Sequence, residues 1–178
     1  MTRCVALLRG VNLGSTRRLA MADLRRVLAD AGYDGVQTHL QSGNVLLESD
    51  LSPQALERQL ETVIGSAFGI PVPVLVRTRR ELAEVVARDP LRGVADDGSR
   101  YLVTFLATRL APAVARELEA ADVAPERVVV GAREVYAWVP DGVQRSRAAR
   151  FLSDARLGVV TTARNWNTVT RLLELTGR

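Results

Sequence analysis

The sequence predicts an α+β protein with two lobes. Its N-terminal half has the split βαβ, ferredoxin-like pattern, and its C-terminal half has a similar topology. Short apolar runs bounded by turn residues alternate with amphipathic helical segments. Their order in the first half is strand, helix, strand, strand, helix, strand. The second half repeats strand, helix, strand, strand, helix, so the topology repeats although the two halves share little sequence.

The composition is typical of a globular protein with an aliphatic core. Of the 178 residues, 47% are hydrophobic and only 4% are aromatic, and this length suffices for one domain or two small lobes. No apolar run approaches the ~20 residues that a membrane-spanning helix needs, and no signal-peptide pattern opens the sequence. Cys4 is the only cysteine, so no intrachain disulfide can form. We therefore expect a cytoplasmic location and no membrane association.

The basic residues of the chain are all arginines. There are 24 of them, and the formal net charge is +4. Arginine binds carboxylate and phosphate through two parallel hydrogen bonds, so an anionic partner is one interpretation. A coding bias across the genome is the other, because the arginines are spread along the chain and make no single patch.

In the first half, apolar periodicity and turn residues define each element in turn. Over 36–41, apolar residues that include Leu40 alternate with polar ones, which indicates a strand with one buried face and a hairpin turn at Ser42-Gly43. Ser52 is a good N-cap, with Pro53 in the first helical position. Prolines in the last strand favour an edge position or a strand start. The predicted elements are a strand over 3–9, a polar loop over 10–19, a helix over 21–31, strands over 36–41 and 44–48, a helix over 53–67 and a strand over 71–76.

The second half begins with a capped helix. Thr78 and Glu81 form a capping-box pattern, and the glycines and aspartates of 91–99 indicate a linker or mobile loop. The predicted elements are a helix over 78–88, strands over 101–106, 127–130, 134–139 and 158–162, and helices over 112–121, after Ser146 and from Trp166 to Gly177. We divide the chain into a ferredoxin-like lobe over 1–77, a helix and linker over 78–99, and a second α+β lobe with a C-terminal helix over 100–178.

The loop after the first strand is the first candidate for a binding site. Gly10 and Gly14 let backbone N–H groups approach a ligand, Asn12 offers an amide, and Arg9 offers a guanidinium. The loop lacks the third spaced glycine of a dinucleotide fingerprint, and no Gly-Lys-Ser/Thr follows as in a P-loop. The alternative is a pair of turn glycines beside an arginine in a structural ion pair.

Residues 41–44 are first of all a hairpin turn, where Ser and Gly are expected. A nucleophilic Ser42 would need an activating base, and His39 is the only histidine of the chain. Because the nucleophile-elbow pattern is also absent, nothing supports a catalytic triad here. Ser42 and Asn44 are instead candidates for contacts with a ligand.

A third polar stretch lies at the start of the last helix. Asn165 is a good N-cap, which is a structural role. The sequence suggests no such role for Arg164, Asn167 or Thr168, and a helix start next to an arginine and hydroxyl groups favours a bound anion.

The sequence predicts no cofactor and no metal. One histidine and one cysteine cannot supply the four ligands of a zinc site, and the acidic pair Asp96-Asp97 is more typical of a solvated loop. We expect Cys4, within a buried strand, to be an inert core residue.

Several stretches are familiar in combination. They are LLRGVNLG over 7–14, QSGN over 41–44 and TTARNWNTVTRLL over 161–173, together with Met21 and YAWVPDG over 136–142. With them the chain resembles the bacterial family of unknown function called DUF1697, over essentially its whole length. The resemblance implies one family domain with an α/β fold of two sub-lobes and no established activity.

Two functions of different classes are compatible with these patterns. In the first, the protein binds a small phosphate- or carboxylate-bearing ligand at a composite polar site between the lobes. The candidate residues are Arg9, Asn12, Gly14, Ser42, Asn44, Arg164, Asn165, Asn167 and Thr168. Catalysis is left open because no strong acid–base pair is visible.

In the second, the protein is a nucleic-acid-binding module that uses an antiparallel sheet. The sequence pI of about 10.1 fits this role, and Tyr136 and Trp138 lie on one face of a predicted strand. The aromatic pair that stacks bases on central strands is missing. A purely structural or partner-binding role is a third possibility, and the oligomeric state is open.

Overall fold

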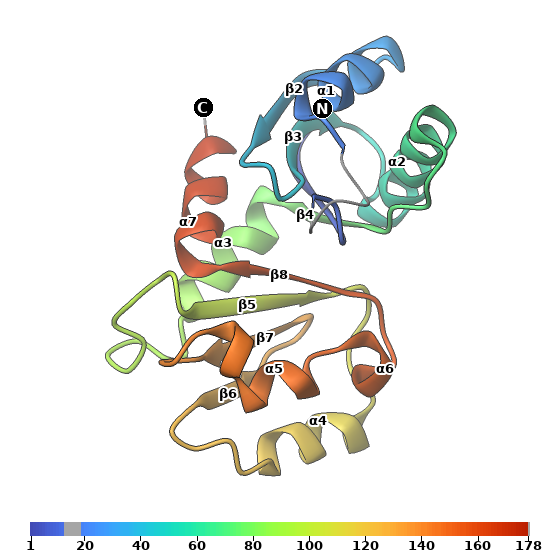
Figure 1. Ribbon diagram of the computed structural model, residues 1–178. Helices are drawn as coiled ribbons and strands as arrows, with labels where there is room; N and C mark the ends of the chain where they lie inside the picture. Colours follow the sequence, from blue (N-terminus) through green and yellow to red (C-terminus); the bar gives the residue numbers. More distant parts are fainter. Residues whose placement is uncertain (13–18, 178) are drawn as a thin grey trace. The chain divides into compact units, whose positions relative to one another are not determined.

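The computed structural model describes residues 1–12 and 19–177, which form two compact units (Figure 1). The first unit consists of Met1–Ala83 and Leu172–Arg178, and the second consists of Glu84–Arg171. Each unit contains one antiparallel sheet of four strands. Among the described residues, no helix combines the length and the apolar character needed to cross a membrane.

Two helices carry the chain from one unit to the other. The boundaries fall within α3 (Arg79–Arg88) and α7 (Trp166–Leu175), so each of these helices belongs partly to each unit. The division into 1–77, 78–99 and 100–178 stays a prediction.

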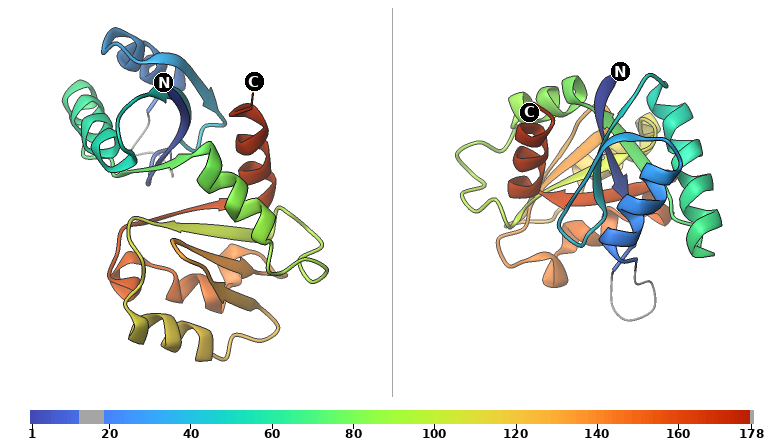
Figure 2. Two further views of the ribbon diagram at one scale, coloured as in Figure 1. Left: turned by 180° about the vertical axis from the view of Figure 1, so that it is seen from behind. Right: turned by 90° about the horizontal axis from the view of Figure 1, so that it is seen from above.

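The first sheet has the strand order β2-β3-β1-β4, with α1 and α2 on one face (Figure 2). Its elements are β1 (Thr2–Leu8), α1 (Met21–Asp30), β2 (Asp34–His39), β3 (Asn44–Ser49), α2 (Pro53–Phe68) and β4 (Val74–Thr78). Alternate residues of β1, namely Cys4, Ala6 and Leu8, lie in the same buried cluster as Leu24 and Leu60 of the helices. The predicted ferredoxin-like pattern of the N-terminal half is therefore confirmed.

The second sheet has the equivalent order, β6-β7-β5-β8. Its unit contains β5 (Tyr101–Leu106), α4 (Pro112–Ala120), β6 (Arg127–Val130), β7 (Glu134–Trp138), a 3-10 turn over Val143–Arg145, α5 (Arg147–Phe151), α6 (Asp154–Leu157) and β8 (Thr161–Asn165). In both sheets the first strand of the repeat is central and pairs with the third and fourth strands, so the predicted similarity of topology is confirmed.

The helix ends follow the capping residues that the sequence predicts. The Ser52 hydroxyl accepts a hydrogen bond from the N–H of Ala55 at 3.4 Å and begins α2, which ends at Gly69 with a φ of 67°. At α3, the Thr78 hydroxyl accepts from the N–H of Glu81 at 3.2 Å, and the Glu81 carboxylate accepts from the N–H of Thr78 at 2.8 Å. These reciprocal bonds are a capping box.

The edge strand β4 begins later than predicted, because Pro71 and Pro73 precede it. Two carboxylates of α2 accept hydrogen bonds from its backbone. Glu57 accepts from the N–H of Val76 at 2.8 Å, and Glu61 accepts from the N–H of Val74 at 3.0 Å. Donors of an edge strand are therefore satisfied within the unit, which reduces the tendency of this edge to pair with another chain.

The predicted position of Leu40 on a buried strand face is wrong. Strand β2 ends at His39, and Leu40 has a φ of 60° and is 55% exposed. The physical reason is the side chain of Asn44, whose Nδ2 donates to the carbonyl of His39 at 2.8 Å and closes the turn there. The hairpin connection consequently spans 40–43 instead of Ser42-Gly43 alone.

The last strand is also displaced, from the predicted 158–162 to Thr161–Asn165. The short helix α6 occupies the preceding residues and ends at Gly158, whose φ is 69°. One oxygen of Asp154, the first residue of α6, accepts hydrogen bonds from both the N–H and the hydroxyl of Thr161, at 3.0 and 2.7 Å. This bond fixes the start of β8 after the helix.

Candidate functional site

Two of the predicted polar stretches meet in the first unit. We call residues 9–12 and 40–43 the loop pair. The side chain of Asn12 joins the two loops, because its Nδ2 donates to the carbonyl of Gln41 at 2.6 Å. The same amide donates to the carbonyl of Leu19 at 2.9 Å and accepts from the N–H of Leu19 at 2.8 Å. The Asn12 side chain therefore binds three backbone groups, two of Leu19 and one of Gln41.

Gly43 brings the two loops into close contact. Its carbonyl accepts a hydrogen bond from the N–H of Leu8 at 2.8 Å. A Cβ atom on Gly43 would lie only 2.5 Å from Val11 Cγ2 and 2.8 Å from Leu8 Cβ. The glycine of this turn is thus explained partly by packing against the first loop.

The backbone of the loop pair is unusual. Gly10, Asn12, Leu40 and Gly43 have φ values of 68°, 56°, 60° and 76°. Among the described residues, three that are not glycine have positive φ, and two of these three lie here. Such conformations cost of order 1 kcal/mol and are concentrated at functional sites. Among the described residues of the first unit, the only two non-glycine residues with a positive φ therefore both lie in the loop pair.

The remaining candidates of the first unit differ in how far the fold uses them. Asn44 is fully buried, and its amide donates to His39 and also to the Ser42 hydroxyl at 3.0 Å. Its visible role is to shape the turn. Ser42 is exposed and Arg9 is half-buried, with the N–H of Arg9 donating to the carbonyl of Pro73 at 2.9 Å. Gly14 lies outside the described residues.

The third polar stretch lies in the second unit, around a buried arginine. Arg164 is 8% exposed, and its Nη1 donates to the Thr162 hydroxyl and to the Ala163 carbonyl, both at 2.8 Å. Burial lowers the pKa of Arg164 to about 10, because removal from water disfavours the charged form.

The start of α7 is already capped within the protein. The Asn165 side chain accepts from the N–H of Thr168 at 2.9 Å, which confirms the predicted N-cap. The N–H of Asn167 donates to the carbonyl of Gly98 at 3.4 Å. Two early donors of this helix thus have protein partners, so the helix start is less available to an anion than its sequence indicates.

A second buried arginine, Arg77, occupies the matching position of the first repeat. Arg77 pairs with Val5 of β1, and Arg164 pairs with Val103 of β5, the equivalent central strand. Arg77 is 2% exposed and donates to the carbonyl of the preceding residue at 2.9 Å, as Arg164 does at 2.8 Å. In both repeats the next residue, Thr78 or Asn165, caps the following helix.

This equivalence was not predicted from the sequence. The signal is short: Arg77-Thr78 and Arg164-Asn165 are each the last two residues of a strand that a helix follows directly. It becomes visible only when the two strand-to-helix junctions are aligned by topology, because the residues around them differ.

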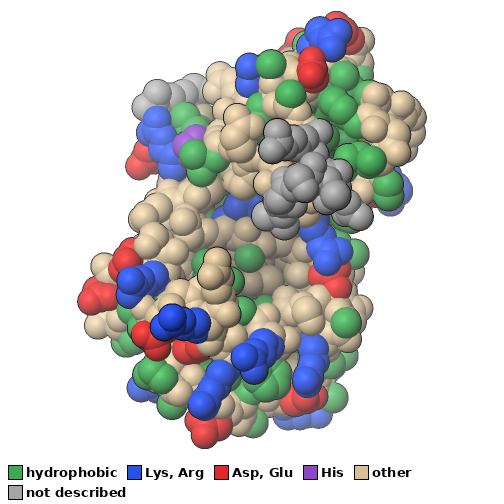
Figure 3. Space-filling view, viewed as in Figure 1, with side chains coloured by type: hydrophobic (Ala, Val, Ile, Leu, Met, Phe, Trp, Pro, Cys, Tyr) green, Lys and Arg blue, Asp and Glu red, His purple; other side chains and the backbone are tan. Residues whose placement is uncertain are grey.

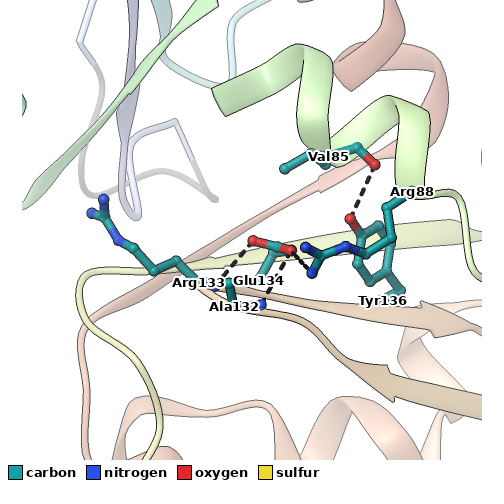
Figure 4. Close-up of polar contacts among 6 residues, drawn as sticks. All are labelled: Val85, Arg88, Ala132, Arg133, Glu134 and Tyr136. Atoms are coloured by element: carbon teal, nitrogen blue, oxygen red, sulfur yellow. Dashed lines mark hydrogen bonds and ion pairs between the residues drawn. The ribbon is translucent and has the colours of Figure 1, made fainter. Parts of the chain in front are cut away.

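One face of the second sheet carries a polar cluster beneath the end of α3 (Figure 4). Glu134 accepts from Arg88 Nη1 at 2.9 Å and from the N–H groups of Ala132 and Arg133 at 3.3 and 3.1 Å. The hydroxyl of Tyr136 donates to the carbonyl of Val85 at 3.0 Å, and burial raises the pKa of Tyr136. The cluster holds α3 on the sheet and covers the ring of Tyr136.

The fold defines a class: an α+β protein with two four-stranded antiparallel sheets of ferredoxin-like topology. The chain belongs to the family described as protein of unknown function DUF1697, whose model matches residues 1–136. The stretch over 161–173 lies beyond the matched residues. Among the described residues, no group of three or more His, Cys, Asp or Glu side chains is arranged to hold a metal ion.

A solved structure supports the same fold. The conserved bacterial protein SP0830 from Streptococcus pneumoniae is similar with a TM-score of 0.79 and 21% sequence identity, over 98% of each chain. At this identity the likeness shows the fold alone. No curated protein matches the chain.

Proposed function

We propose that the protein binds a small ligand that carries a phosphate or carboxylate group, and that the loop pair of the first unit makes the primary contact. The observation that supports this most is the left-handed backbone of Asn12 and Leu40, in two loops that Asn12 ties together. Conformations of this kind persist only where the surrounding structure enforces them. A surface that binds a ligand is one reason for a fold to enforce such conformations.

The residues of the loop pair have different roles in this proposal. Arg9 supplies the cation, because a guanidinium binds carboxylate or phosphate with two parallel hydrogen bonds. Ser42 supplies an exposed hydroxyl. Asn12 and Asn44 position the loops, because their amide groups already bind backbone or hydroxyl groups of the turn.

The polar residues of the second unit form a second set in the proposal. Arg164 and Thr168 are buried polar side chains, whereas Asn165 and Asn167 belong to the capped start of α7. Arg164→Gln removes the charge of this set, and weaker ligand binding by this variant would include the set in the site.

The test is binding of inorganic phosphate, nucleotides, sugar phosphates and simple carboxylates, measured by thermal shift and calorimetry. We expect Arg9→Gln to weaken the strongest binder by about tenfold or more, because a charge-assisted contact is lost. Arg116→Gln, an exposed arginine on α4, is the matched control and should bind as the parent does. Full binding by Arg9→Gln would exclude the loop pair as the primary contact.

Nucleic-acid binding is the less supported alternative. Tyr136, one of the two aromatic residues on which it relied, is covered by α3 and so offers no open face for a base. On the face seen in Figure 3, arginine and acidic side chains alternate over the second unit and form no continuous basic stripe. Binding of a mixed oligonucleotide at low salt, where phosphate contacts are strongest, would reverse this ranking.

A further inference from the structure

The first unit contains a cavity of about 800 Å³ on the side of its helices. Its walls come from the first residue of the chain, the turn between α1 and β2, the end of β3 with the residue that follows it, and one face of α2. The residues that matter here are Tyr33, Glu48, Asp50, Arg58, Gln59 and Val63. None of the loop-pair residues lines it, so the cavity is separate from the site of the proposed function.

The acidic side chains of the cavity already have cationic partners. Glu48 lies 3.4 Å from Arg3 Nη1, and Asp50 lies 2.9 Å from the amino group of Met1. Arg58, on the α2 wall, makes no side-chain hydrogen bond or ion pair with any residue that the structure describes. The charge left without compensation in the cavity is therefore positive and amounts to one guanidinium.

The groups next to Arg58 complete a surface for a carboxylate. The hydroxyl of Tyr33 donates to Gln59 Oε1 at 3.1 Å. This bond fixes the orientation of the amide and leaves its Nε2 as a donor, on the residue of α2 that follows Arg58 and lines the same cavity. The ring of Tyr33 and the side chain of Val63 are half-buried and supply an apolar wall. The hydroxyl of Tyr33 is protonated at neutral pH, as an ordinary tyrosine is, and burial raises its pKa further.

We propose that this cavity is a second binding site, which takes a small monocarboxylate with an apolar body. The carboxylate binds Arg58 and Gln59 Nε2, and the apolar part packs on Tyr33 and Val63. One guanidinium matches one negative charge, which favours a carboxylate over a phosphate dianion. The volume is within the range of roughly 300–1,000 Å³ that is usual for small-molecule sites.

The experiment is a titration of the full chain, followed by amide chemical shifts in two-dimensional NMR, with hexanoate, benzoate, acetate and inorganic phosphate as probes. We expect hexanoate or benzoate to bind at millimolar concentrations and to shift the amides of α2 and Tyr33. Acetate should bind more weakly because it lacks the apolar body. Phosphate should leave these amides unchanged.

Variants then separate this site from the loop pair. Arg58→Gln, a substitution on an exposed helix face, should weaken the carboxylate binding seen at the α2 amides about tenfold or more, whereas the control Arg116→Gln should leave it unchanged. Val63→Gln should weaken hexanoate more than acetate. The proposal is overturned if no carboxylate shifts the α2 amides, or if Arg58→Gln binds as the parent does. Neither result bears on the loop pair, which is tested through Arg9.

Discussion

At the scale of single residues, Gly43 shows how closely the two loops of the first unit pack. A Cβ atom at this position would overlap Val11 and Leu8, and the φ of 76° strains any L side chain. We expect Gly43→Ala to lower the free energy of unfolding by about 2–4 kcal/mol, the sum of a backbone cost of about 1 kcal/mol and overpacking of about 1–3 kcal/mol. Urea denaturation measures the difference.

Gly69→Ala is the control that isolates the backbone cost. Gly69 has a similar φ of 67°, and nothing lies within 4 Å of a Cβ atom placed on it. It should lose only about 1 kcal/mol. Equal losses for the two variants would mean that the loops move apart at little cost, and the close packing of the loop pair would then not be a constraint.

Asn165 tests whether a candidate ligand residue acts mainly as a helix cap. Asn165→Ala should lower the free energy of unfolding by about 1 kcal/mol, because the N–H of Thr168 loses its acceptor. Asn165→Asp keeps an acceptor oxygen and should restore most of the loss. Chemical denaturation and the ligand screen should be run on both variants. A stable Asn165→Ala that fails to bind would assign this side chain to the ligand.

At the scale of elements, the carboxylates of α2 protect the edge of β4. Glu61→Ala removes the acceptor for the N–H of Val74, so we expect a loss of about 0.5–1.5 kcal/mol and a greater tendency to self-associate. Glu61→Gln retains the acceptor oxygen and serves as the control. Denaturation curves and size-exclusion chromatography report the two effects. If Glu61→Ala remained as stable and as monodisperse as Glu61→Gln, the hydrogen bond would have no protective role.

Most elements could be predicted from the sequence because their signals are local. The caps at Ser52 and Thr78 and the apolar periodicity of α1 and α2 are contained within a few residues each. The errors occurred where a distant or unrecognised contact decides the outcome. Leu40 is exposed because Asn44 closes the turn early, and β8 starts late because Asp154 holds Thr161.

The candidate site was predictable only in part. The sequence identified the loops around Arg9 and Ser42, and the structure brings these loops together through Asn12. The sequence could not show that the side-chain amides of Asn12 and Asn44 form hydrogen bonds within the protein, because their partners are backbone groups. Arg77 was missed because its equivalence to Arg164 is a matter of strand register, which no local pattern shows.

At the scale of the whole molecule, buried tyrosines set the response to alkali. Burial raises the pKa values of Tyr101 and Tyr136 above 10. Above pH 10 the unfolded chain therefore releases these protons more readily than the folded protein does. Stability is retained below about pH 10 and should fall as the pH rises above it. Arg164, with a lowered pKa, has the opposite sign over the same range, and two tyrosines outweigh it.

Tyr136→Phe checks the origin of this pH dependence. The variant loses a hydrogen bond to Val85 and should be less stable by about 1 kcal/mol at neutral pH. Its stability should nevertheless fall less steeply than that of the parent between pH 9 and about pH 11, in denaturant titrations at each pH. An unchanged slope would show that the phenol of Tyr136 does not control the alkaline loss.

The passage of the chain through α3 and α7 has a consequence for biosynthesis. Because the first unit includes Leu172–Arg178, a nascent chain cannot complete that unit until the ribosome has translated the whole of the second. The order of completion is thus the reverse of the order of initiation: the unit that starts first finishes last. The four strands of the first sheet all precede α3, so during translation this sheet is made before the C-terminal segment that completes its unit.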